Sequence, residues 1–211
     1  MLKPGLIQIY TGPPDFVNYA PLGLMLRASG RNLRTLYVAF KQAAYGDALE
    51  LAASRLEPNL VVGRSMGMDP GSQTPPVRGR VLETFQKAQA SVLEGRFDMV
   101  ILDGLLDPGI QEIVEKGELL LFTQKKPAHV ELVLTGSADD EIIQRADLVT
   151  DMRVHKGTGS RTPAGADIDG SIEVVTGNGK GKTTHCLGKA MGAALSGVSA
   201  FVLQVIKSPR L

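Results

Sequence analysis

Cysteine is almost absent from this chain of 211 residues, in which Cys186 is the single one. One cysteine cannot form an intrachain disulfide, so the chain has no disulfide framework and a reducing cytoplasm is its expected location. Its 3 histidines are scattered, and no cysteine–histidine cluster has the spacing of metal ligands. We therefore expect no transition metal held by protein side chains.

Excess charge and long apolar runs are also lacking. The 23 Lys and Arg residues against 22 Asp and Glu give a formal net charge of +1, so any electrostatic function must be local. No apolar run is long enough to span a bilayer, and the N-terminus has no apolar signal region. The hydrophobic content of 43% is ordinary for a soluble globular protein. We expect neither a nucleic-acid nor a membrane partner.

Short apolar runs alternate with helical patterns along the chain. We predict strands at residues 5–11, 33–40, 59–63, 98–102, 130–135, 148–154, 172–175 and 200–206. We predict helices at residues 16–29, 45–56, 77–94, 108–125 (interrupted near Gly117), 138–145 and 183–195, with a loop at 66–76. This alternation predicts an α/β fold, with a mostly parallel sheet covered by helices on both faces. Ligands of such sheets bind at the C-terminal ends of strands, where Thr176 and Asp103 fall.

A glycine- and lysine-rich loop follows the expected strand at residues 172–175. It consists of Thr176, Gly177, Asn178, Gly179, Lys180, Gly181, Lys182, Thr183 and Thr184. Strand, glycine loop and helix in this order form the phosphate-binding device of P-loop proteins. Glycines let backbone N–H groups approach phosphate oxygens, and the helix N-terminus adds the positive end of its dipole. The position of the usual first glycine is held by Thr176.

The polar side chains of this loop have distinct expected roles. Lys182 should contact the terminal phosphates, and Thr183 should place its hydroxyl on Mg²⁺. Lys180 either adds charge or is simply solvated, and Thr184 either contacts phosphate or caps the helix. Asp103 is a weaker Mg²⁺ candidate, with a loop cap as the alternative. No residue is singled out as catalytic.

The two ends of the chain are related to each other. Gly5–Gly12 matches Gly170–Gly177 at an offset of 165 residues, and Leu22-Gly23 matches Leu187-Gly188 at the same offset. In the first copy the loop is replaced by residues 13–19, which include two prolines, and Val17 stands where the second copy has Lys182. The first copy is therefore predicted not to bind a triphosphate at this place.

The repeat predicts the domain organisation. We expect a degenerate α/β domain at residues 1–155, a linker at 156–170, and the first βαβ unit of a second copy at 171–211. By comparison with the first copy, roughly three quarters of a domain is missing from the second. We expect a truncated or fragmentary second copy.

The loop closely resembles that of the corrinoid adenosyltransferases of the ATP-dependent P-loop type, which show the same departure from the common motif. Three further segments resemble that family, at residues 97–103, 127–136 and 146–153. Three places depart from it: Gly104 replaces a Glu, Ser137 replaces an Arg, and the pair His155-Lys156 is reversed. The resemblance implies a P-loop NTPase fold of the RecA-like type.

The resemblance also implies an activity. It is the transfer of the 5′-deoxyadenosyl group of ATP to the Co(I) of a corrinoid, with release of triphosphate, in adenosylcobalamin biosynthesis. ATP and a corrinoid are the implied substrates, Mg²⁺ the cofactor, and an electron-donor protein a further partner. Two alternatives stay open, a P-loop ATPase or kinase and a non-catalytic scaffold. We expect the apolar segments 172–175 and 200–206 to join the first sheet or to pair with another chain as a homodimer.

Overall fold

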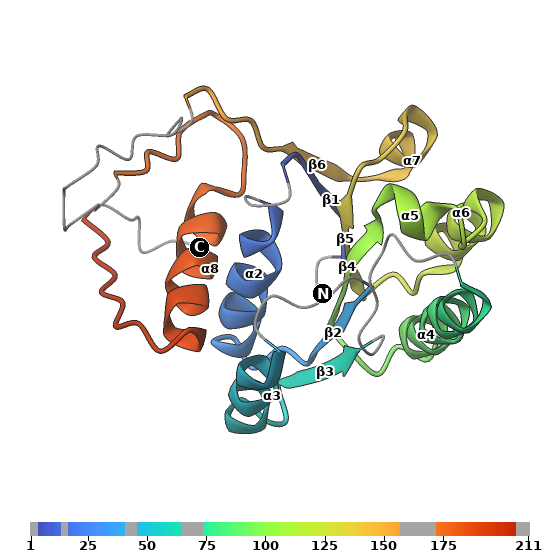
Figure 1. The fold of residues 1–211 in the computed structure, drawn as a ribbon, viewed down its shortest axis with the longest axis horizontal. Coiled ribbons are helices and arrows are strands. Elements are labelled where there is room, and N and C mark those ends of the chain that lie inside the picture. Colours follow the sequence, from blue (N-terminus) through green and yellow to red (C-terminus); the bar gives the residue numbers. More distant parts are fainter. Residues whose placement is uncertain (1–3, 14–16, 41–45, 65–73, 157–171, 206–211) are drawn as a thin grey trace.

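A parallel sheet of six strands lies at the centre of the molecule (Figure 1). The computed structural model describes residues 4–13, 17–40, 46–64, 74–156 and 172–205. The strands are β1 (Ile7–Thr11), β2 (Thr35–Ala39), β3 (Leu60–Arg64), β4 (Met99–Leu106), β5 (Glu131–Gly136) and β6 (Leu148–Asp151). Their order across the sheet is β3-β2-β4-β5-β1-β6, and each neighbouring pair is parallel.

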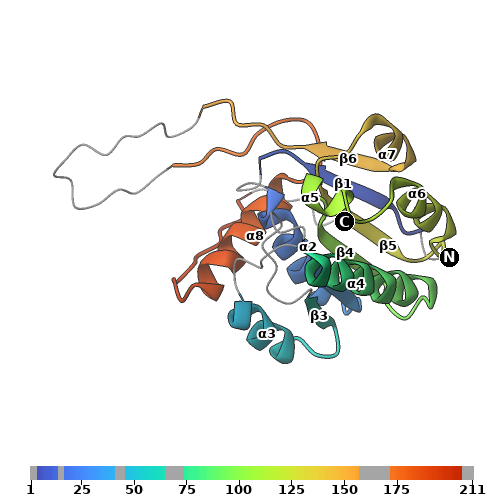
Figure 2. The ribbon, with the colours of Figure 1, turned by 45° about the vertical axis from the view of Figure 1, so that its right-hand side comes forward.

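Helices cover both faces of this sheet (Figures 1 and 2). One face carries α2 (Tyr19–Ser29) and α3 (Gly46–Arg55), and the other carries α4 (Pro75–Leu93), α5 (Pro108–Gln111), α6 (Lys116–Lys125) and α7 (Asp140–Arg145). Since successive strand side chains point to opposite faces, Ile101 packs on the α2 side, whereas Val100 and Leu102 pack on the α4 side. The predicted α/β fold, with a mostly parallel sheet covered by helices on both faces, is confirmed.

Strand β4 is longer than the sequence predicts. The prediction ended it at Leu102, directly before Asp103, but the strand continues to Leu106, and Leu105 and Leu106 are both buried. Its register with β5 shifts between Leu102 and Leu106, and Gly104 has a φ of +76°. An irregularity of this kind lets a strand resume after a local bend. Asp103 therefore lies inside the strand and does not end it.

The break in the helical region at residues 108–125 falls earlier than the sequence predicts. Helix α5 ends at Gln111 and α6 begins at Lys116, so Gly117 lies inside α6. Because it is helical, Gly117 itself marks no turn, and the interruption lies between Gln111 and Lys116. The predicted loop at 66–76 and linker at 156–170 fall mostly outside the described residues.

Helix α8 (Lys182–Leu195) packs on α2, on the side of α2 that faces away from the sheet (Figures 1 and 2). The helix predicted at residues 183–195 is therefore confirmed, and it forms a third layer outside α2 (Figure 1). The glycine-rich loop thus leads into a helix that does not itself cover the six-stranded sheet.

The strands predicted on either side of α8 are wrong. Residues 172–177 and 198–205 form no strand, and Ile172 and Phe201 are 95% and 88% exposed. An apolar run becomes a strand only where a neighbour pairs its N–H and C=O groups. Neither segment pairs with the described strands, so the expectation that they join the first sheet is contradicted. Their pairing with another chain stays a prediction.

Candidate phosphate-binding site

The loop ahead of α8 has a backbone that requires glycine. Gly177 and Gly181 have φ values of +122° and +110°, which side-chain-bearing residues rarely adopt. Gly181 is the N-cap residue of α8. A β-carbon on Gly177 or on Gly179 would have no atom of another segment within 4 Å, so the loop backbone is open there. A ligand can therefore reach the main chain at these glycines.

The start of α8 offers backbone donors to an anion. The backbone N–H of His185 donates to the carbonyl oxygen of Gly181 at 2.7 Å, as the first full helical turn requires. The N–H groups of Lys182, Thr183 and Thr184 precede that bond, at the helix end where N–H groups have no intrahelical acceptor. No acidic residue occupies the first turn of α8. The helix end is therefore suited to a phosphate group.

The loop lies at the carboxyl edge of the sheet. A β-carbon on Gly181 would lie 3.1 Å from the methyl carbon of Thr150 on β6 and 3.7 Å from the ring of Tyr10 on β1. Both residues are close to the C-terminal ends of their strands. This edge is where open α/β sheets bind ligands.

The two lysines of the loop differ in their surroundings. The ammonium of Lys182 donates to the carbonyl oxygen of Gly179 at 2.6 Å, so it folds back over its own loop. Lys180 is exposed and acts electrostatically on Glu131 in β5. Burial raises the pKa of Glu131, and a hydrogen bond from Gln8 together with nearby positive charges, Lys180 among them, opposes that shift. The ammonium of Lys182 therefore lies over the loop, whereas the charge of Lys180 acts on the sheet at Glu131.

The two threonines at the start of α8 are in opposite environments. Thr183 is exposed, so its hydroxyl is accessible to an ion. Thr184 is 2% exposed, and its Oγ1 accepts a 2.8 Å hydrogen bond from Nη1 of Arg27 on α2. The hydroxyl of Thr184 therefore already serves the contact between α2 and α8.

A small charged cluster holds the segment before the loop against α8. Glu173 accepts a 2.8 Å hydrogen bond from Nε2 of His185 through one carboxylate oxygen and contacts Lys189 through the other. Burial alone would raise the pKa of Glu173, but the hydrogen bonds from Lys189 and His185 outweigh it and the pKa is lowered. Sequence reasoning missed Glu173 and Arg27, although a glutamate within the apolar run at 172–175 was a usable signal.

Asp103 is tied into the first sheet. It is buried, and its carboxylate accepts hydrogen bonds from the hydroxyls of Tyr37 at 2.8 Å and Thr135 at 2.6 Å. These partners lie on β2 and β5, whereas the loop belongs to the segment before α8. The weaker Mg²⁺ assignment for Asp103 thus gains no support from its contacts, which are those of a structural carboxylate.

The matching loop of the first copy differs where charge would be needed. Gly12 has a φ of +132°, close to the +122° of its match Gly177. Val17, which stands in the place of Lys182, is 2% exposed and belongs to the apolar core beneath α2. The two loops thus begin with the same backbone bend, but a core side chain replaces the lysine in the first.

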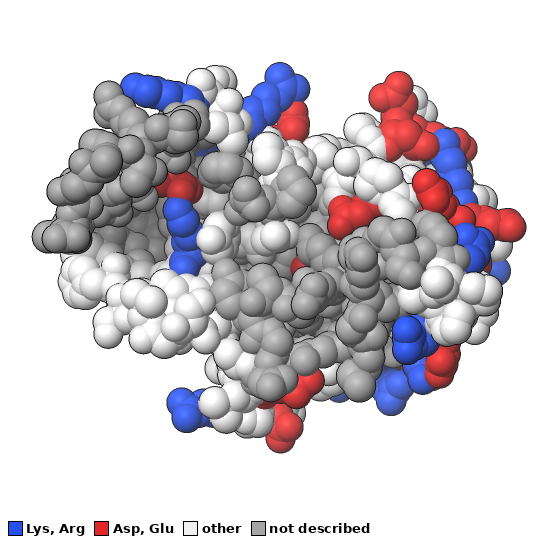
Figure 3. All heavy atoms as spheres, in the orientation of Figure 1, with Lys and Arg blue, Asp and Glu red and all other residues white. Residues whose placement is uncertain are grey.

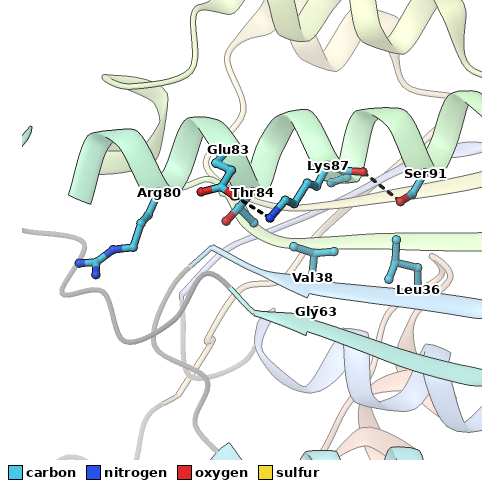
Figure 4. A pocket seen from close by; sticks show the side chains of 9 residues that line it. Leu36, Val38, Gly63, Arg80, Glu83, Thr84, Lys87 and Ser91 are labelled. Carbon is cyan, nitrogen blue, oxygen red and sulfur yellow. Dashed lines mark hydrogen bonds and ion pairs between the residues drawn. The ribbon is translucent and has the colours of Figure 1, made fainter. Parts of the chain in front are cut away.

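A separate cavity of about 310 Å³ lies between α4 and strands β2 and β3 (Figure 4). Leu36 and Val38 form its apolar floor, and the ion pair of Glu83 with Lys87, at 2.6 Å, lies along α4. This cavity is on the face of the sheet opposite α2 and α8, so it contains none of the predicted site residues.

Other classes of site leave little trace in the described part of the chain. Within it, no group of three or more His, Cys, Asp and Glu side chains is arranged to hold a metal ion. None of its helices combines the length and the apolar character needed to cross a membrane. On the face shown in Figure 3, acidic and basic side chains lie interspersed around the edge.

Known proteins similar to this chain include one curated sequence and a distant structure. The uncharacterized protein all2391 of Nostoc sp. (strain PCC 7120) is 27% identical over 215 residues, which cover 92% of this chain and 55% of that protein. The chain thus spans about half the length of this curated relative. The flagellar accessory protein FlaH of Methanocaldococcus jannaschii has a TM-score of 0.42 at 12% identity, over 71% of this chain and 72% of that chain. Because this TM-score is low, the fold is assigned from the order and direction of the strands alone.

The family comparison covers nearly the whole chain. The model of the family described as ATP:corrinoid adenosyltransferase BtuR/CobO/CobP matches residues 3–165 and 168–211. The second matched range contains the entire loop and α8. By this match, the chain belongs to the ATP:corrinoid adenosyltransferase BtuR/CobO/CobP family.

Proposed function

We propose that this chain takes part in the transfer of the 5′-deoxyadenosyl group of ATP to the Co(I) of a corrinoid. The reduced cobalt attacks C5′ of the ribose, a cobalt–carbon bond forms, and the bond between C5′ and the triphosphate oxygen breaks. Cobalt supplies both electrons of the new bond and becomes Co(III), while the triphosphate leaves with the electron pair of the broken bond. Membership of the family supports this reaction.

One observation links the proposed reaction to particular residues. Gly177 and Gly181 bend the loop, with positive φ values, onto the N-terminus of α8, which has no acidic residue in its first turn. We assign residues 176–184 to the triphosphate. Lys182 and Lys180 would offset the negative charge of the triphosphate and so stabilise it as a leaving group. Lys182 needs only to release the carbonyl oxygen of Gly179 to do so.

The residues present also fit a magnesium ion at this loop. Mg²⁺ is commonly held by one or two protein oxygens together with substrate phosphates and water. Thr183 is the exposed hydroxyl that follows Lys182, so it is the ligand we assign, with the remaining positions left to phosphate and water. When bound, the ion would neutralise part of the charge of the leaving triphosphate.

We further propose that the chain contains two units of one kind, a first at residues 1–155 without a working phosphate loop and a second that begins at about residue 171 after a linker. Two separate ranges matched by one family model support this division. The burial of Val17 at the position of the loop lysine supports a structural first unit. A homodimer and an electron-donor protein remain proposals that derive from the family resemblance and from the exposed apolar segments.

ATP binding by the full chain tests the assignment of the loop. Replacing Lys182 with Ala should raise the ATP dissociation constant by about 10- to 100-fold, since charged hydrogen bonds contribute about 1.5–3 kcal/mol. Lys87→Ala is the matched control, because Lys87 pairs with Glu83 on the opposite face of the sheet. Isothermal titration calorimetry measures both. Equal ATP affinities in the Lys182→Ala variant and the wild type would remove the loop from the triphosphate site.

A further inference from the structure

Helices α2 and α8 touch through their backbones. A β-carbon on Gly23 would lie 1.9 Å from the carbonyl oxygen of Thr184, and one on Gly188 would lie 1.8 Å from the carbonyl oxygen of Tyr19. Real β-carbons do not approach other atoms so closely, so both positions require glycine. Small residues at a helix crossing let the backbones come together in this way.

The two contacts are related by the internal repeat. Tyr19 and Thr184 are matched at the offset of 165 residues, and so are Gly23 and Gly188. Exchanging the members of each matched pair converts one contact into the other. The positions for a β-carbon on the two glycines also lie equally close, at 3.0 Å, to the backbone nitrogen of the opposite glycine. Such reciprocity is the signature of a two-fold interface between like units.

The side-chain contacts around the crossing depart from this symmetry. Arg27 of α2 donates to Thr184 of α8, but the residue matched to Arg27 is Gly192, which has no side chain to reach back. The ring of Tyr19 meets that of His185 edge-on, with centroids 5.4 Å apart. The hydrogen bond from Arg27, which has no symmetric counterpart, therefore runs from the unit without a phosphate loop to the helix that follows the loop.

The segments that flank α8 also have buried counterparts in the first unit. Val174 is 78% exposed, whereas its match at the 165-residue offset, Ile9, is fully buried in β1. Leu203 is 72% exposed, and its counterpart Tyr37, after a one-residue gap in the repeat, is buried in β2. Apolar side chains at core positions of a repeat call for the rest of that unit around them.

We propose that the outer face of α2 is a docking surface for the phosphate-loop helix of a second α/β unit of the same kind, carried on the same polypeptide. The two units pair about an approximate two-fold axis, as the subunits of a symmetric dimer do. The first unit, which has lost its own phosphate loop, thereby holds α8 in place. This inference depends on the two-unit organisation and is independent of the reaction that the loop serves.

Hydrogen–deuterium exchange of the full chain tests the pairing, with two interface and two control variants. Gly23→Ala and Gly188→Ala place a methyl group against backbone atoms of the opposite helix. Gly79→Ala in α4 and Gly117→Ala in α6 are matched controls, because their β-carbons meet nothing within 4 Å. Each interface variant should lower the exchange protection of both helices by about tenfold or more, including the helix without the substitution. The controls should leave both helices as in the wild type.

Three results would overturn the proposal. Loss of protection in α2 alone in the Gly23→Ala variant would show that α8 does not depend on α2. Rapid exchange of α8 in the wild-type protein would do the same without any variant, should an interface variant fail to fold. Protection of α8 that rises with protein concentration would assign the contact to two chains and not to one.

Discussion

Arg27 on α2 donates a 2.8 Å hydrogen bond to the hydroxyl of Thr184, the second residue after Lys182 on α8. This bond joins residues that are 157 positions apart in the chain. It connects α2, which packs on the six-stranded sheet, to the start of the helix that follows the glycine-rich loop. A side chain of α2 therefore helps to hold the start of α8 in place.

Loss of this bond should destabilise the protein. Arg27→Ala leaves the buried hydroxyl of Thr184 without its donor, which should cost about 1–3 kcal/mol of unfolding free energy. Urea unfolding measures the change. Arg34→Ala is the control, since Arg34 pairs with Asp98 at 3.8 Å with both side chains partly exposed, and such pairs contribute about 0–1 kcal/mol. Equal effects of the two substitutions would mean that the bond to Thr184 does not contribute specifically.

The loop glycines should differ in their tolerance of a side chain. Gly177→Ala forces a residue with a β-carbon to a φ of +122°, a strain of about 1–3 kcal/mol, and should weaken ATP binding by about 10- to 100-fold. Gly179→Ala meets neither a neighbouring atom nor a positive φ, so its effect should be smaller. Calorimetric titration with ATP compares them. A larger loss for Gly179→Ala would contradict the role assigned to the bend.

The hydroxyl of Thr135 should be a structural requirement of β4. It donates to Asp103 at 2.6 Å and accepts the backbone N–H of Gly104 at 2.7 Å, both in buried surroundings. Thr135→Val removes both bonds and should cost about 2–3 kcal/mol in urea unfolding. The matched control Thr123→Val loses only a bond to the carbonyl oxygen of Leu120 in its own helix and should cost less. A loss at Thr135 no greater than at Thr123 would argue against this network.

The Glu173 cluster should make stability depend on pH. The folded-state pKa of Glu173 lies below its ordinary value of 4.5, so its contribution is present above about pH 4.5 and is lost as the pH falls through the folded pKa. The difference in unfolding midpoint between wild type and Glu173→Gln should therefore shrink below pH 4.5. Glu83→Gln is the control, because the lowered pKa of Glu83 arises from an exposed pair with Lys87. A difference at Glu173 that grows in acid would contradict the cluster.

Most of the sheet could be predicted because its strands are apolar runs between turn signals, as at Met99–Leu106. The end of β4 was misplaced because the charged Asp103 interrupts the apolar run, although two more buried leucines follow the bend at Gly104. The strands at 172–175 and 200–206 were misjudged for a different reason. Their pattern is that of strands, but no described neighbour pairs with them.

The candidate site was predictable in its loop and not in its surroundings. Glycine spacing and the following helix identify residues 176–184 locally, because φ preferences and helix ends are properties of neighbouring residues. Arg27 and Glu173 could not be assigned in the same way, since their roles depend on α8 packing against α2. That packing becomes visible in the sequence only when Gly23 and Gly188 are compared as a matched pair.

Product analysis under anaerobic conditions tests the proposed reaction most directly. The full chain is incubated with ATP, Mg²⁺ and a chemically reduced corrinoid, with Lys182→Ala as the negative control. The proposal predicts that a cobalt–carbon bond appears in the visible spectrum and that one triphosphate is released for each corrinoid alkylated. ADP and phosphate as the nucleotide products, with no cobalt–carbon bond, would contradict it.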